Sequence, residues 1–251
     1  MRRLVMLLAL FALLLTFSKR VEAVPLLVSG DATVAGGLLA DLNFGAEDYG
    51  GGLLTGSDGS GLFGPYRFYL LFALPVFVPD TFISSATLRG FYSDDWDTFD
   101  DRTHSFYQAP AAWSESTITW NNQPGPLGGS LGSFNAAAAT PGTLVSWDVT
   151  FALNAAYLVQ DSLFSLLFRA DNEALGVPPV INNNLEYFAS REFLGGQAAF
   201  TIDVTVVPEP ATVPEPATLV LLATGLLVAG GRRRTRRVPD GQVVDAWQLR
   251  R

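Results

Sequence analysis

The segment Phe200-Thr201-Ile202-Asp203-Val204-Thr205-Val206 alternates apolar and polar side chains without interruption. Successive side chains of a β-strand point to opposite faces, so one face of this segment is apolar and the other is polar. Such a strand is stable only where a second layer covers its apolar face. The segment therefore predicts a half-buried strand in a layered β-structure.

Other segments show the same alternation, or form short apolar runs bounded by Gly, Pro, Asp and Asn. They predict strands at Val24–Val34, Tyr66–Phe72, Ile83–Tyr92, Thr103–Gln108, Ser116–Trp120, Leu144–Val149 and Leu163–Phe168. Residues 41–61 and 125–142 are rich in glycine or other small residues and are predicted as loops. Many short strands without a strand–helix rhythm predict an all-β fold, an antiparallel β-sandwich over residues 24–207.

One short helix is predicted in this domain. Asp148 or Thr150 is suited to cap its start, and it runs through Tyr157 with Phe151 and Leu158 near one side.

The domain is strongly acidic. Residues 24–207 contain nineteen Asp and Glu, five Arg and no Lys. This charge repels polyanions, so nucleic acid is not expected as a partner. It suits a solvated protein of the cell exterior, or a site for a cation. The chain has no cysteine, so the domain folds by core burial without a disulfide or a thiolate metal site.

The N-terminal segment, residues 1–23, has the order of a signal peptide. Residues 2–3 are arginines, and residues 4–17 are mostly apolar. Small residues before and at Ala23 suit a cut by signal peptidase after that position. The basic residues 19–20 are unusual there, so an uncleaved N-terminal anchor stays open.

The C-terminal segment combines a spacer, an apolar run and a basic tail. Residues 208–216 contain Pro-Glu-Pro twice, and residues 217–231 carry no charge. The tail, residues 232–251, opens with a basic cluster of Arg232, Arg233, Arg234, Arg236 and Arg237. Such a cluster favours the cytoplasmic face of a membrane. Residues 217–231 are therefore predicted as a short transmembrane helix and residues 232–251 as a basic cytoplasmic tail. A helix of this run reaches about 22 Å, short of the roughly 30 Å hydrocarbon core, although snorkelling and local thinning make up part of the difference. The alternative is a buried core helix.

This order of elements resembles the PEP-CTERM sorting signal of Gram-negative bacteria. The resemblance implies recognition of Pro214, Glu215 and Pro216 by an exosortase, a membrane enzyme that acts on an inner-membrane-anchored precursor. The resemblance also implies delivery of the protein to the cell surface or the extracellular matrix. Which Pro-Glu-Pro copy is used stays open, because Pro208-Glu209-Pro210 precedes the second copy. Such signals also usually end close to the arginine cluster, whereas fourteen residues follow Arg237 here.

One segment of the mature region is specific to a known family, namely Trp113-Ser114-Glu115-Ser116-Thr117-Ile118-Thr119-Trp120-Asn121-Asn122-Gln123-Pro124. The other matching segments, in the expected order, are Asp31, Arg67–Phe72, Ile83–Leu88, Trp147–Thr150 and Phe188–Glu192. In these segments the mature region resembles the DNRLRE domain. The resemblance implies a jelly-roll β-sandwich similar to polysaccharide-binding modules of secreted or surface proteins.

Three aromatic side chains are candidates for stacking on sugar rings: Trp96, Phe99 and Trp113. For Trp113 a place in the core is the alternative, and Trp120, on a predicted strand, is expected in the core. Glu115, Asn121 and Asn122 are expected to fix turns. Arg191 and Glu192 are expected to form a partly buried pair that closes the sandwich.

The candidate metal ligands are the acidic cluster Asp94, Asp95, Asp97, Asp100 and Asp101. Carboxylates crowded in this way repel one another unless a cation or solvent separates them, and hard oxygen ligands suit Ca²⁺. The cluster therefore predicts either a calcium site or a solvated acidic loop.

Catalysis is not predicted. His104 is the one histidine of the sequence and lies on a predicted strand, where packing is its expected role. The sequence has no nucleophile elbow, phosphate loop or metalloprotease helix. We expect a cell-surface or matrix protein that contacts exopolysaccharide without acting on it. The alternatives are a purely structural matrix or biofilm component and, behind it, an enzyme acting on polysaccharide.

Overall fold

The structure is a computed structural model, which describes residues 22–45, 52–58, 62–76, 81–95, 103–173, 184–193 and 200–208. The chain divides into two compact units, Met1–Glu209 and Pro210–Arg251, and every described residue belongs to the first. Most of the predicted signal peptide, the second Pro-Glu-Pro motif, the apolar run and the arginine cluster lie outside the described residues. Among the residues that are described, no helix is long and apolar enough to cross a membrane.

The first sheet, sheet A, is built on β5 (Thr81–Asp95). Three strands pair with β5 in antiparallel orientation: β8 (Thr143–Asp148), β11 (Thr201–Pro208) and β10 (Glu186–Ala189). The sheet is extended by β3 (Gly52–Thr55) beside β10, and by the first part of β1 (Glu22–Gly37) beside β11.

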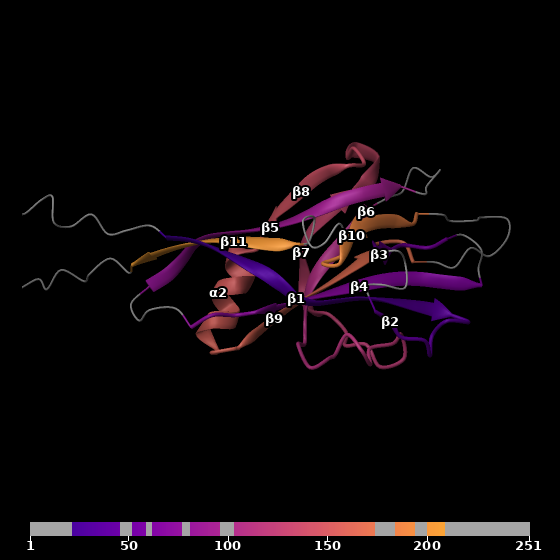
Figure 1. The fold of residues 1–251 in the computed structure, drawn as a ribbon, viewed down its shortest axis with the longest axis horizontal. Coiled ribbons are helices and arrows are strands. Elements are labelled where there is room, and N and C mark those ends of the chain that lie inside the picture. Colours follow the sequence, from indigo (N-terminus) through magenta and orange to yellow (C-terminus); the bar gives the residue numbers. More distant parts are fainter. Residues whose placement is uncertain are drawn as a thin grey trace, which may run out of the picture. The chain divides into compact units, whose positions relative to one another are not determined.

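The second sheet, sheet B, runs in the order β2 (Phe44–Gly45), β1, β4 (Phe63–Ala73), β9 (Leu163–Ala170), β6 (Thr103–Ala109) and β7 (Leu127–Asn135). The two sheets share β1, which pairs with β11 through Leu27 and with β4 from Val28 onward (Figure 1). The register of the β1–β4 pair shifts between Val28 and Gly30, at this crossing from one sheet to the other. The predicted all-β antiparallel sandwich is confirmed.

The main core lies between the two sheets and is rich in phenylalanine. Phe68 of β4 stacks on Phe168 of β9 with ring centroids 4.5 Å apart, and Phe188 from sheet A tilts against both rings. The predicted alternation of β11 is confirmed, since Ile202 and Val204 are buried in this core. Trp147 of β8 is half-buried against the same cluster, with its ring close to those of Phe106, Phe134, Phe168 and Phe188.

Helix α2 (Thr150–Leu158) follows β8 and packs against β5. Val149 occupies the N-cap position and no side chain caps the helix there, so the prediction of Asp148 or Thr150 as the cap is wrong. The Asp148 carboxylate, one residue before the N-cap, accepts the backbone N–H of Thr150 at 2.8 Å. The buried face of the helix consists of Ala152, Leu153 and Ala156. Phe151 and Leu158 are 86% and 84% exposed, so the larger apolar side chains lie on the solvent side.

Three parts of the predicted strand pattern are wrong. Residues 116–120 form turns, with no strand among them. Residues 125–142, predicted as a loop, contain strand β7 and the short 3-10 helix η2 (Ala136–Ala138). At Gly132 of β7, packing requires a residue without a side chain, because an added Cβ would lie 2.6 Å from the ring of Phe106. The predicted loop 41–61 also contains β2 and β3.

Candidate functional site

The outer face of sheet B is covered by a loop, residues 110–126, which we call the cover loop. Buried apolar side chains of β1, β4, β6 and β9 form a second cluster on this face: Ala32, Val34, Tyr69, Ala109 and Leu167. Ile118 of the cover loop is buried in that cluster, and the half-buried rings of Trp113 and Trp120 pack against it. The Trp-Ser-Glu-Ser-Thr-Ile-Thr-Trp segment is therefore a lid over a sheet face and not a strand of the sheet.

Asparagine side chains hold the backbone of the cover loop in place. The amide of Asn43 donates to the carbonyl oxygens of Glu115 at 2.9 Å and Ile118 at 2.6 Å. Asn122 accepts the N–H of Thr119 at 2.7 Å and donates to the Thr117 carbonyl at 2.9 Å. The prediction that Asn122 fixes a turn is confirmed.

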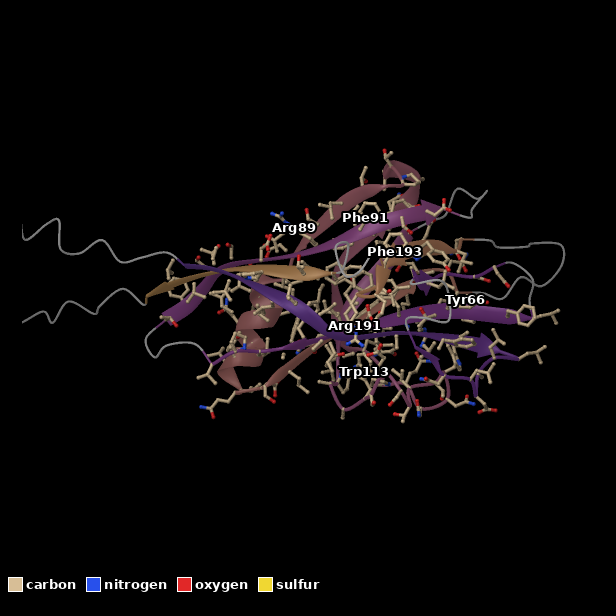
Figure 2. The ribbon with its side chains drawn as sticks, viewed as in Figure 1. Tyr66, Arg89, Phe91, Trp113, Arg191 and Phe193 are labelled. Atoms are coloured by element: carbon tan, nitrogen blue, oxygen red, sulfur yellow. The ribbon has the colours of Figure 1, made fainter. Side chains whose placement is uncertain are left out.

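Trp113 lies near the start of the cover loop (Figure 2). Its indole N–H donates to the hydroxyl of Ser165 at 2.9 Å, and its ring meets the ring of Tyr69 edge-on at 5.7 Å. A hollow of about 410 Å³ lies next to this contact. It is lined by Gln108, Ala109, Pro110, Ala111, Ala112, Leu127, Asp161, Ser162, Leu163 and Ser165. Trp113 is thus joined to a lining residue of a hollow that combines apolar and hydrogen-bonding groups.

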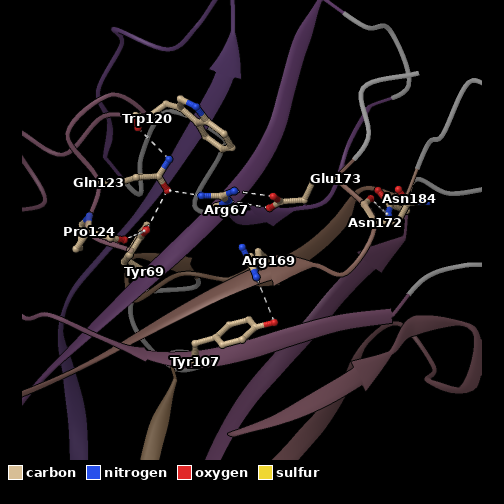
Figure 3. A network of polar contacts seen from close by, with 10 residues as sticks. All are labelled: Arg67, Tyr69, Tyr107, Trp120, Gln123, Pro124, Arg169, Asn172, Glu173 and Asn184. Atoms are coloured by element: carbon tan, nitrogen blue, oxygen red, sulfur yellow. Dashed lines mark hydrogen bonds and ion pairs between the residues drawn. The ribbon is translucent and has the colours of Figure 1, made fainter. Parts of the chain in front are cut away.

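Trp120, near the other end of the cover loop, lies under the guanidinium of Arg67 at 4.3 Å (Figure 3). Arg67 also donates twice to the Glu173 carboxylate, at 2.7 and 2.6 Å. The amide oxygen of Gln123 accepts from Arg67 at 3.3 Å and from the Tyr69 hydroxyl at 2.9 Å. Burial raises the pKa of Tyr69, which keeps this hydroxyl a donor. Trp120 is accordingly not a strand residue of the main core but part of a polar network on the outer face.

Arg191 joins three distant segments at the crossing of β1 (Figure 2). The predicted pair is confirmed, with its Nε 2.5 Å from a carboxylate oxygen of Glu192. The same guanidinium lies 2.8 Å from the Glu115 carboxylate of the cover loop and donates to the Ser29 carbonyl at 2.6 Å. The backbone N–H of Arg191 donates to Asp31 at 2.8 Å. These contacts tie the chain after β10 to β1 and to the cover loop.

The predicted calcium ligands lie mostly outside the described residues. Asp94 is exposed at the end of β5, and the backbone of Asp95 pairs with Glu186. Asp97, Asp100 and Asp101, like Trp96 and Phe99, belong to the part of the chain that is not described. The calcium site at this cluster stays a prediction.

In the sequence, strand β6 lies between the acidic segment, with Trp96 and Phe99, and the cover loop, with Trp113. His104, on that strand, is buried with its Nδ1 3.2 Å from the Thr55 hydroxyl, so its predicted packing position is confirmed.

Comparison with known families agrees with this architecture. Residues 22–178 of the sandwich, from the start of β1 to beyond β9, match a family of carbohydrate-binding modules. The chain belongs to carbohydrate-binding module family 96. Strands β10 and β11, which complete sheet A, follow the matched region.

The PEP-CTERM protein-sorting motif matches residues 212–234, which confirms the resemblance to that sorting signal. The match includes Pro214-Glu215-Pro216 and Arg232–Arg234, and it leaves out Pro208-Glu209-Pro210. No curated protein matches the chain.

Proposed function

We propose that this domain is a non-catalytic module that holds exopolysaccharide or another surface glycan outside the cell. The chain is exported as an inner-membrane-anchored precursor, and an exosortase processes it for display at the cell surface or in the matrix. The hollow beside Trp113, in a member of a carbohydrate-binding family, is the observation that carries the proposal. The sorting-motif match supports the export step.

The chemistry around the hollow suits a sugar. An indole face matches the apolar face of a pyranose ring. Gln108, Asp161 and Ser162 bring amide, carboxylate and hydroxyl groups for sugar hydroxyls, next to alanine, proline and leucine side chains. A volume of about 410 Å³ falls within the usual range for small-ligand pockets. Trp113 is a better platform than Trp120, because a guanidinium already stacks on the Trp120 ring.

Trp96 and Phe99 are proposed as a second sugar platform beside the acidic cluster. This part of the proposal rests on their residue type and on their place in the sequence alone. It is tested separately from the hollow by changing Trp96 and Phe99 to alanine together.

The test measures binding of the purified chain to exopolysaccharide from the producing organism. Trp113→Ala and Asp161→Ala are expected to weaken binding at least tenfold, as loss of a central aromatic or polar contact does. Asp171→Ala is the matched control, because Asp161 and Asp171 are exposed acids on either side of β9. Equal affinity in all three variants would overturn the hollow as the site. A folded wild-type chain that binds no glycan would favour the purely structural role.

A further inference from the structure

Three carboxylates meet where β1 crosses between the sheets: Asp31, Glu115 and Glu192. We call them the crossing carboxylates. One oxygen from each lies within 4.8 Å of the other two. They come from β1, from the cover loop and from the chain after β10, so only the folded sandwich brings them together. Asp31 is fully buried, and the other two are half-buried.

Two oxygens of this group are buried without a hydrogen-bond donor among the described residues. Asp31 uses Oδ2 to accept the backbone N–H of Arg191, while its Oδ1 has no partner. Glu192 uses Oε1 for the Arg191 guanidinium, while its Oε2 has no partner. A buried carboxylate oxygen normally has a donor or a cation against it. Both oxygens therefore indicate a missing ligand of positive charge.

The net charge of the crossing carboxylates and Arg191 also indicates a bound cation. When all three are ionised, as metal ligands are, Asp31, Glu115 and Glu192 bring three negative charges, and Arg191 brings one positive charge. The remaining charge of minus two equals that of one divalent cation in opposite sign. The contacts of Arg191 thus leave part of the charge of the ionised group uncompensated.

The separations among the carboxylate oxygens are compatible with a bound calcium ion. Oxygens that bind Ca²⁺ lie at about 2.3–2.6 Å from the ion, so two ligands on opposite sides are up to roughly 5 Å apart. The separations among the crossing carboxylates fit this limit. All three donors are hard carboxylate oxygens, which favour Ca²⁺ over softer metals. We propose that Asp31, Glu115 and Glu192 bind a calcium ion that fastens the cover loop to the crossing of β1.

This site is separate from the acidic cluster at residues 94–101 and does not depend on the proposed glycan function. Its ligands lie far apart in the sequence, so calcium bound there stabilises the folded chain over the unfolded one. The acidic cluster is local in sequence and would bind with less dependence on the fold. Variants of the two groups therefore distinguish them.

The experiment measures the thermal midpoint of the full chain, and calcium binding by titration calorimetry, after treatment with chelator. Calcium is expected to raise the midpoint and to bind at one site per chain through these ligands, and magnesium at equal ionic strength is expected to do less. Asp31→Asn and Glu192→Gln should remove the calcium response. The double variant Asp95→Asn, Asp97→Asn is the control and should retain it.

Glu115→Gln covers the case in which Asp31→Asn fails to fold, because Glu115 lies on the half-exposed loop. It should weaken calcium binding at least tenfold while leaving the chain folded in chelator. The proposal is overturned if calcium and magnesium shift the wild-type midpoint equally. It is also overturned if the calcium response survives in Glu115→Gln and Glu192→Gln but disappears in the control variant.

Discussion

The backbone N–H of Arg191 donates to the carboxylate of Asp31 at 2.8 Å, across 160 residues of sequence. Asp31 lies in β1 just after its crossing between the sheets, and Arg191 follows β10 of sheet A. This contact and the side-chain contacts of Arg191 make one residue responsible for joining both sheets to the cover loop.

We predict that Arg191→Met lowers the free energy of unfolding by about 2–4 kcal/mol, because charged hydrogen-bonding partners lose their donor together. Arg191→Lys should recover only part of this, since an ammonium lacks the planar fork of donors. Urea unfolding measures both. Arg89→Met is the control, because the Arg89–Asp203 pair is about half exposed and is expected to contribute less than about 1 kcal/mol. Equal losses at Arg89 and Arg191 would contradict the assigned role.

The pKa of Asp31 predicts a pH dependence of stability in the presence of chelator. Burial raises this pKa from 3.8 to about 7 in the folded chain. Between these values the folded state holds a proton that the unfolded state has released, so stability falls as pH rises through this window. Asp31→Asn is neutral throughout and should not show this loss. Urea unfolding between about pH 4 and pH 8 compares the two, and parallel curves would contradict the prediction.

Trp147→Ala is predicted to destabilise the domain by about 3–5 kcal/mol, as truncation of a large core aromatic does. The ring of Trp147 contacts the phenylalanine core, with centroids 5.5 Å from those of Phe106 and Phe168. Phe151→Ala, at an 86% exposed position of α2, is the matched control and should change stability by less than about 0.5 kcal/mol. Denaturant midpoints measure both, and similar values would mean that Trp147 contributes no core packing.

Replacing Pro214-Glu215-Pro216 by alanines is predicted to retain the precursor in the inner membrane. We expect the first copy to be the poorer signal, because Pro208 belongs to β11 and pairs with Thr81, and the sorting-motif match begins at residue 212. The double variant Glu209→Ala, Pro210→Ala should therefore be sorted normally. Cell fractionation follows both. Normal release of the first variant would show that the second copy is dispensable.

The strands of the main core could be predicted from the sequence, because their period-two alternation follows directly from the inner and outer faces of the sheets. Strand β7 could not, since glycine and serine there fit against the ring of Phe106 and leave no apolar alternation to detect. For residues 116–120 the local sequence predicts a strand that the fold does not contain. Their β-branched side chains favour a strand, but the amides of Asn43 and Asn122 hold their backbone in turns.

The candidate sites show the same limit. Trp113 and the Arg191–Glu192 pair could be singled out from residue type and local sequence. The hollow beside Trp113 could not, because its lining comes from β6, the cover loop, β7 and the start of β9. Nor could the partnership of Glu115 with Arg191, which are 76 residues apart. Such contacts depend on the order in which the strands pair, and no single segment of the sequence predicts that order.

The position of β11 has a mechanical consequence. This strand is hydrogen-bonded to β5 along one edge and to β1 along the other. A pull that enters through the chain beyond Pro208 acts lengthwise on β11, so the bonds of both ladders bear the load together and do not open one at a time. We expect a domain tethered through this strand to resist pulling, as the proposed role of holding a glycan at the cell surface would require.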